Sequence, residues 1–252
     1  MLSGFRVFPG APPRGQPSST FIAVTILVEA AVESLDAALA AAEGGAHRIE
    51  LCTDLAHGGT TPAVQLLRDC RSQLVIPVFV LVRPRAGDFV YTDAEHHTML
   101  EQIQRAKEAG AHGIVTGALT GAKEIAEDRT AELLDAGRPL PVTFHRAFDE
   151  CGDLAAALER LILLGVERVL TSGGAPTAAE GAEAIGRLVI QAQGAGRRIE
   201  ILAGGGIDGG NVARLVHDTG VREVHFSARD SGKVRGVVRS LETVKGQIPK
   251  TH

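Results

Sequence analysis

Aromatic side chains, cysteine and methionine are scarce in this sequence of 252 residues, and tryptophan is absent. Phenylalanine and tyrosine together make up 4% of the chain, which leaves no aromatic platform of the kind that stacks nucleic-acid bases. The formal net charge of −4 argues against a broad basic face for a phosphate backbone. We therefore expect no nucleic-acid partner.

The three cysteines are Cys52, Cys70 and Cys151, and they form no close pair and no CxxC motif. This spacing indicates neither a disulfide framework nor a structural zinc site. Reduced thiols are typical of a cytoplasmic protein, which is the location we expect.

Long apolar runs are also missing. The apolar run at residues 21–28 is too short to span a membrane and leads into Glu29, so it predicts a buried strand and no membrane partner. Residues 1–22 are rich in Pro, Gly and Ser, which predicts a flexible tail rather than a signal peptide. We expect residues 23–248 to form a single domain.

Glycine, by contrast, is abundant: 30 residues, a share of about 12% against about 7% in an average protein. Four glycines begin the same pattern, in which Gly is followed by Ala or Val, two mostly polar residues and an apolar stretch. These are Gly45, Gly110, Gly165 and Gly220. Because glycine can adopt the left-handed conformation that ends a helix, each copy predicts a junction between a helix and a strand.

Four further strands are predicted between these copies, at residues 25–30, 78–83, 142–145 and 199–203. Helical patterns separate the strands, and Thr92 with Glu95 forms a capping box at the start of one of them. Eight strand–helix units of about 28 residues each predict an α/β fold, a single-domain TIM (β/α)8 barrel. A doubly wound parallel sheet is the alternative. The final predicted helix, at residues 234–246, follows an unusually short eighth loop.

Charged and polar residues gather near the carboxyl ends of the predicted strands, where TIM barrels build their active sites. Because side chains alternate along a strand, Glu50 and Cys52 are expected to share one face of their strand, and Arg83 and Arg85 to share one face of theirs. Glu29 is expected at the end of the first strand. A buried ion-pair network that only orients the strands would explain any single residue. We favour function for the whole set, since burying so many charges costs stability.

Two kinds of role are predicted for these residues. A catalytic role is assigned to Glu29, Glu50, Arg83, His145 and His225. Glu50 or His145 would act as the general base, and Arg83 would hold an anionic group together with Arg85. Anion binding is assigned to a group that lies partly in the loops after the seventh and eighth strands, namely Arg85, Gly204, Gly205, Gly206 and Ser227. Aldolase chemistry through a Schiff base is rejected, because none of the lysines falls on a predicted strand.

Several sequence blocks together resemble the CutC family of copper-homeostasis proteins. These blocks are RIELC at 48–52, HGGTTP at 57–62, RPRAGDFVY at 83–91, VTFHRAFD at 142–149 and RVLTSG at 168–173. The resemblance runs from about Val28 to Arg229. It implies a cytosolic TIM barrel, a homodimer or higher homo-oligomer, and motif residues that line the carboxyl-end mouth. This sequence differs from many members of that family in one respect, because they have a longer segment after the eighth strand.

The resemblance implies copper(I) as a ligand, held by one cysteine at the end of the first strand and by the cysteine of RIELC. Here the second is present as Cys52, but Ala31 occupies the position of the first. Cys151 is the other thiol expected on the same rim. Two hypotheses remain: a copper(I)-binding protein of copper homeostasis, or a metal-independent lyase or isomerase. The second would act on a small anionic, phosphorylated or sugar-like substrate. No other cofactor is implied.

Overall fold

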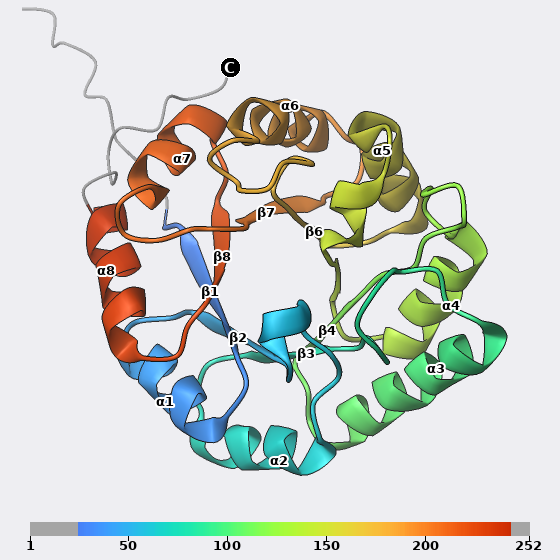
Figure 1. Ribbon diagram of the computed structural model, residues 1–252, viewed down its shortest axis with the longest axis horizontal. Helices are drawn as coiled ribbons and strands as arrows, with labels where there is room; N and C mark the ends of the chain where they lie inside the picture. Colours follow the sequence, from blue (N-terminus) through green and yellow to red (C-terminus); the bar gives the residue numbers. More distant parts are fainter. Residues whose placement is uncertain (1–24, 243–252) are drawn as a thin grey trace, which may run out of the picture.

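The protein is described by a computed structural model over residues 25–242. Eight parallel strands pair in chain order and close into a barrel, because β8 (Glu223–Ser227) pairs with β1 (Leu27–Val32). The helices form a ring around the barrel (Figure 1). The predicted TIM (β/α)8 fold is therefore confirmed. The predicted tail at residues 1–22 lies outside the described residues.

The other strands and the helices alternate without interruption. The remaining strands are β2 (Arg48–Leu51), β3 (Val78–Leu81), β4 (Gly113–Thr116), β5 (Val142–Phe144), β6 (Arg168–Thr171) and β7 (Glu200–Gly204). The helices are α1 (Leu35–Glu43), α2 (Val64–Gln73), α3 (Asp93–Glu108), α4 (Glu127–Gly137), α5 (Leu154–Leu164), α6 (Ala182–Gln193), α7 (Val212–Thr219) and α8 (Ser231–Glu242). Two short 3-10 helices follow β2 and β5, at Leu55–His57 and Arg146–Glu150.

The four glycine junctions have the predicted conformation. Gly45, Gly110, Gly165 and Gly220 all have a positive φ, between +71° and +97°, and each lies between a helix and the next strand. The capping box that opens α3 is also present: Thr92 accepts from the backbone of Glu95, whose side chain accepts from the backbone of Thr92. These local signals set where most units of the barrel begin.

Three predicted boundaries are wrong in ways that affect the site. The first strand was expected at 25–30, but β1 continues through the apolar Ala31 and Val32, so Glu29 lies in its middle and not at its end. The third strand ends at Leu81 rather than at residue 83. The last helix begins at Ser231 and not at residue 234. Only residues 228–230 separate it from the end of β8, so the eighth loop is short, as expected.

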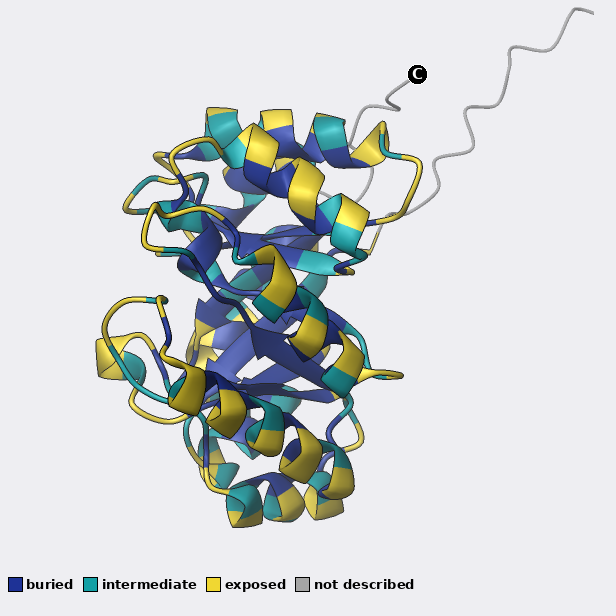
Figure 2. Ribbon diagram, turned by 90° about the vertical axis from the view of Figure 1, so that its right-hand side faces the viewer, coloured by how far each residue is buried: buried dark blue, intermediate teal, exposed yellow. Residues whose placement is uncertain are grey.

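Side chains that point out of the barrel pack beneath the helices and form the main hydrophobic core. The strands are almost entirely buried, while the outer faces of the helices are exposed (Figure 2). No helix within residues 25–242 is long and apolar enough to cross a membrane. The barrel interior, in contrast, contains most of the buried charges.

A short segment lies across the carboxyl end of the barrel. The 3-10 helix Leu55–His57, cyan in Figure 1, lies over the centre of the ring of strands. Leu55 packs against a small apolar cluster inside the barrel that includes Ala31 and Cys52. Left-handed backbone at Asp54 and Gly58 bounds this segment on both sides. The mouth of the barrel is therefore partly covered.

Candidate active site in the barrel interior

Inside the barrel, the level nearest the amino ends of the strands is formed by one residue from each of β2, β4, β6 and β8. In each case it is the third residue after the junction glycine. These residues are Arg48, Gly113, Arg168 and Glu223. The ring of Phe79 fills the space above Gly113, where an added Cβ would lie 2.5 Å from the ring. The guanidinium carbons of Arg48 and Arg168 lie 4.8 and 5.5 Å from the centre of the same ring. An aromatic face thus holds two buried cations near the floor of the barrel.

Ion pairs connect this floor to the interior level above it. Glu223 Oε2 accepts from Arg168 Nε at 2.6 Å and from Arg48 Nη2 at 2.7 Å. The Nε of Arg48 donates to Glu29. His225 Nδ1 lies 2.8 Å from the other oxygen of Glu29 and 3.5 Å from Glu50 Oε2. Together these contacts form a chain in which cations and carboxylates alternate.

We call this set the interior charge chain. Its members, in order, are Arg168, Glu223, Arg48, Glu29, His225 and Glu50. Three cations face three carboxylates, so the chain is neutral when His225 is protonated and Glu50 is ionised. Such pairing compensates the cost of burying each charge. The structure thus brings together three predicted catalytic residues, Glu29, Glu50 and His225.

The carboxyl groups of Glu29 and Glu50 have opposite pKa shifts. Burial alone would raise the pKa of Glu29, but the charge of Arg48 and the hydrogen bond from His225 outweigh it and lower the pKa to about 2. Glu50 has no arginine in direct contact. Burial and the nearby charge of Glu29 therefore raise its pKa to about 7, although His225 and Arg48 oppose the shift. The carboxyl groups of Glu29 and Glu50, which both face the imidazole of His225, thus differ in protonation near neutral pH.

These neighbours favour the protonated form of His225. Burial would lower its pKa, but the charges of Glu50 and Glu29 and the hydrogen bond to Glu29 raise it above the usual histidine value. One oxygen of Glu50, Oε2, is buried and has no hydrogen-bond donor among the described residues. Glu50 is therefore the end of the chain at which a proton can be exchanged with a bound molecule.

The same three side chains also have the donor types of a metal site. One ligand atom from each of Glu29, Glu50 and His225 lies within 4.8 Å of the other two. Carboxylate and imidazole suit a divalent ion and not copper(I), which prefers sulfur. A divalent ion would have to displace the proton of His225, whose pKa is raised. A bound divalent ion and a protonated His225 are therefore alternative states of this site.

Arg83 and His145 form a second group at the mouth. Arg83 is 5% exposed and donates to the backbone carbonyls of Gly59 at 2.8 Å and Gly87 at 2.7 Å. His145 directly follows β5 and is also 5% exposed. The ring of Phe89 contacts both side chains, 4.8 Å from the Arg83 guanidinium carbon and 4.9 Å from the centre of the His145 ring.

Arg85 does not share a face with Arg83, because β3 has already ended and the alternation of a strand no longer applies. Its side chain turns back to Glu95 at 2.5 Å and to Asp88 at 2.9 Å, and its remaining N–H groups meet the carbonyls of the same loop. The guanidinium thus ties its loop to the start of α3. Anion binding by Arg85 stays a prediction.

Of the predicted anion-binding glycines, Gly204 lies beside the interior charge chain. A Cβ on Gly204 would lie 2.5 Å from Leu170 Cδ1 and 3.3 Å from His225 Cδ2, so glycine allows close packing of β7 against these two side chains. Gly205 and Gly206 have φ of +108° and +69°, conformations that favour glycine. Ser227 is exposed at the end of β8, and its carbonyl accepts from Lys233. Anion binding at these four residues remains a prediction.

The cysteines are separated by the wall of the barrel. Cys52 belongs to the apolar cluster inside the barrel, next to Ala31, and its Sγ donates to the carbonyl of Val32 at 3.4 Å. Cys151 belongs to the outer core between the helices. Burial, together with the charges of Glu50 and Glu33, raises the pKa of the Cys52 thiol. The structure thus places the two thiols in separate clusters.

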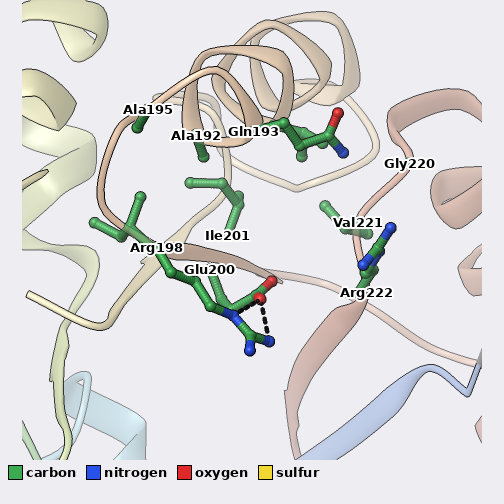
Figure 3. Close-up of a pocket in the computed structure, with 11 residues that line it drawn as sticks. Ala192, Gln193, Ala195, Arg198, Glu200, Ile201, Gly220, Val221 and Arg222 are labelled. Carbon is green, nitrogen blue, oxygen red and sulfur yellow. Dashed lines mark hydrogen bonds and ion pairs between the residues drawn. The ribbon is translucent and has the colours of Figure 1, made fainter. Parts of the chain in front are cut away.

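A hollow at the opposite end of the barrel differs from the mouth in its chemistry (Figure 3). It has a volume of about 260 Å³ and is lined by residues of α6 and by the starts of β7 and β8. Arg198 and Glu200 at its edge pair with each other at 2.7 Å. Because TIM-barrel enzymes place their chemistry at the carboxyl ends of the strands, we do not assign the active site here.

The predicted site residues do not include Arg48, Arg168, Glu223 or Phe79. The signal was present: the first three residues share one position in the repeated glycine pattern, two residues before Glu50, Leu170 and His225. With a period of two along a strand, that position points into the barrel as well. Phe79 gave no such signal, since an aromatic residue in a strand usually belongs to the outer core.

The fold and this interior define a (β/α)8 barrel with a buried chain of charges that leads to its mouth. The protein belongs to the CutC family, whose family model matches residues 26–230. This confirms the resemblance seen in the sequence blocks.

Known relatives cover most of the protein. It is 49% identical over 209 residues to a human copper homeostasis protein cutC homolog, covering 82% of this chain and 76% of that protein. A CutC family protein of Bacteroides thetaiotaomicron is 45% identical over 206 residues, covering 81% and 82%. The crystal structure of the putative copper homeostasis protein CutC from Streptococcus agalactiae matches with a TM-score of 0.76 and 35% identity, covering 81% and 99%.

Proposed function

We propose that this protein is an enzyme of the isomerase or lyase type that moves a proton on a small anionic substrate bound at the barrel mouth. The observation that carries the proposal is the state of Glu50: a buried carboxyl whose pKa is raised to about 7, with one oxygen that has no donor among the described residues. A general base works best when its pKa lies near the operating pH. Glu50 meets this condition.

The neighbours of Glu50 support the same role. Glu50 would remove a proton from a carbon next to a carbonyl, and the electron pair of that C–H bond would move onto the carbonyl oxygen. The cationic His225, fixed by Glu29, would stabilise the negative charge that develops. The proton would then return from Glu50 to the product carbon in an isomerase, or a leaving group would depart in a lyase.

Hydrogen exchange tests this function without knowledge of the natural substrate. The purified full-length protein is incubated in D2O with small hydroxy acids, keto acids and sugar phosphates, and proton NMR follows the loss of the signal next to the carbonyl. We expect at least one compound to exchange this hydrogen faster than in buffer. If no compound in the panel exchanges, the proposal is contradicted.

Copper(I) binding is the second candidate function, since the human and Streptococcus relatives are named for copper homeostasis. Cys52 is the thiol that would carry it, because it lies inside the barrel. Ala31 in the same cluster supplies no sulfur, and the raised pKa of Cys52 disfavours the thiolate that copper(I) prefers. The cytoplasmic location and the homo-oligomer stay predictions.

Substitution of Cys52 tests the copper(I) candidate. If it holds, Cys52→Ser abolishes stoichiometric copper(I) binding in an anaerobic competition with a chromophoric chelator, because a hydroxyl is a poor ligand for a soft ion. Cys70→Ser, which removes a buried thiol on the outer side of the barrel wall, serves as the matched control and should bind as the wild type does. Unchanged binding by Cys52→Ser would sink the idea.

A further inference from the structure

Arg83 is a buried cation without a carboxylate partner. Its Nη1 donates to the carbonyls of Gly59 and His57, and its Nη2 donates to the carbonyl of Gly87. These acceptors are neutral, and no Asp or Glu within residues 25–242 forms an ion pair with this guanidinium. A buried charge is normally paired, because leaving it unpaired is strongly destabilising. One positive charge at the mouth is thus left without its counterpart.

Two hydrogen-bond donors of this group are also unused. The Nε of Arg83 and the Nε2 of His145 are both buried and have no partner within ordinary hydrogen-bond geometry in the described part of the chain. The buried hydroxyl of Tyr91 also has no such partner; burial raises the pKa of this tyrosine, and it lies close enough to Arg83 for this contact to oppose the shift. Because Ala147 N–H donates to His145 Nδ1 at 3.2 Å, the proton of the neutral ring resides on Nε2. Burial and the charge of Arg83 lower the pKa of His145 to about 3, so the ring stays neutral at physiological pH.

The two donors belong to one compact group. Phe89 contacts both the Arg83 guanidinium and the His145 ring, with centre distances of 4.8 and 4.9 Å. Gly117 makes room for the imidazole, since a Cβ at that position would lie 2.9 Å from the ring. An unpaired donor is costly to bury, and both side chains are only 5% exposed. The geometry therefore favours an external acceptor.

We propose that Arg83 and His145 bind the carboxylate of the substrate, with Arg83 Nε–H and His145 Nε2–H each donating to one of its oxygens. This names the substrate class of the proposed function and rests on it only in calling the bound molecule a substrate. The single charge of Arg83 and the neutral ring of His145 match a carboxylate monoanion. They would leave a phosphate dianion with one charge uncompensated.

The position of this pair relative to the interior charge chain fits that role. Arg83 binds the carbonyl of Gly59, and a Cβ on Gly59 would lie 3.6 Å from Cys52 Cβ. Cys52 directly follows β2, two residues after Glu50, and belongs to the apolar cluster inside the barrel. The carboxylate would thus be held above the side of the barrel that contains Glu50.

Acetate and inorganic phosphate are the probes that test this subsite. In the full-length protein labelled with 15N-histidine, we expect acetate to shift the Nε2–H resonance of His145 in a saturable way, while phosphate leaves it in place. A His145→Gln variant identifies the resonance. A saturable shift with phosphate but not with acetate, or no shift with either probe, would overturn the proposal without any need for an Arg83 variant.

Substitution of Arg83 measures its part in the affinity. Arg83→Met should weaken acetate binding at least tenfold, because the charge and one of the two donors are lost. Arg105→Met, which removes an arginine paired with Glu101 on the surface of α3, should leave the affinity unchanged. Equal losses in both variants would show a general charge effect and overturn the proposal.

The outcome is separable from that of the proposed function. Acetate binding that depends on Arg83, in a protein that exchanges no hydrogen in D2O, would uphold the subsite and contradict the enzyme. Hydrogen exchange by the wild type, with a KM that the Arg83→Met substitution leaves unchanged, would uphold the enzyme and contradict the subsite.

Discussion

Replacing Glu50 with Gln is expected to lower the rate of hydrogen exchange on a responsive substrate by a factor of about 10²–10⁴, the usual contribution of a general base. Glutamine keeps the size of the side chain and can still face His225, but it cannot accept a proton. The rate constant kcat should therefore fall while KM changes little. Exchange is measured by proton NMR in D2O, over the same compounds as for the wild type.

The pH dependence of the wild-type reaction gives this prediction a second readout. Because Glu50 acts as a base only when ionised, the exchange rate should rise with pH through an apparent pKa of about 7. Glu183→Gln, which neutralises an exposed glutamate on α6, is the matched control and should keep both the rate and the pH profile. Exchange by Glu50→Gln at the wild-type rate would rule out Glu50 as the base.

Replacing Arg48 with Met is expected to lower the free energy of unfolding by about 3–5 kcal/mol, the effect of leaving a buried carboxylate unpaired. Arg48 contacts both Glu29 and Glu223, and its side chain is 4% exposed. The loss is measured by urea unfolding, with the slope of the transition compared between variants. Arg105→Met, which breaks an exposed pair, should change the stability by less than about 1 kcal/mol.

A double variant distinguishes the ion pair from simple packing. When Glu29→Gln is added to Arg48→Met, the carboxylate that lost its partner is removed as well, so part of the stability should return. The coupling between the two sites is the difference between the double variant and the sum of the single ones. A loss of less than about 1 kcal/mol in Arg48→Met alone would show that the interior charge chain is not held together as we describe.

The sequence was informative where a local rule applies to each unit. A glycine that ends a helix and an apolar stretch of four to six residues recur in order, so the barrel and most of its strands follow from the chain alone. The same alignment placed Glu50 and His225 on the interior face. Their closeness to Glu29 could be expected from a closed barrel, because β1 lies between β2 and β8.

Other parts of the site depend on contacts that no local pattern contains. Arg83 and Arg85 are two residues apart in one block, yet one faces backbone carbonyls at the mouth and the other pairs with Glu95. The difference arises where β3 ends, which the apolar pattern does not mark. The contrast between Glu29 and Glu50 likewise depends on Arg48, whose side chain reaches Glu29 and not Glu50.

Titration of the Glu50 carboxyl is the most direct test of the account. Carbon-13 NMR of glutamate-labelled protein, with Glu50→Gln and Glu29→Gln used for assignment, follows both groups as the pH changes. We predict that Glu50 titrates with a pKa of about 7 and that Glu29 stays ionised down to a pH of about 2. If Glu50 instead titrates near 4.5, like an ordinary glutamate, the charge chain does not end in a group that exchanges protons and the proposed chemistry is contradicted.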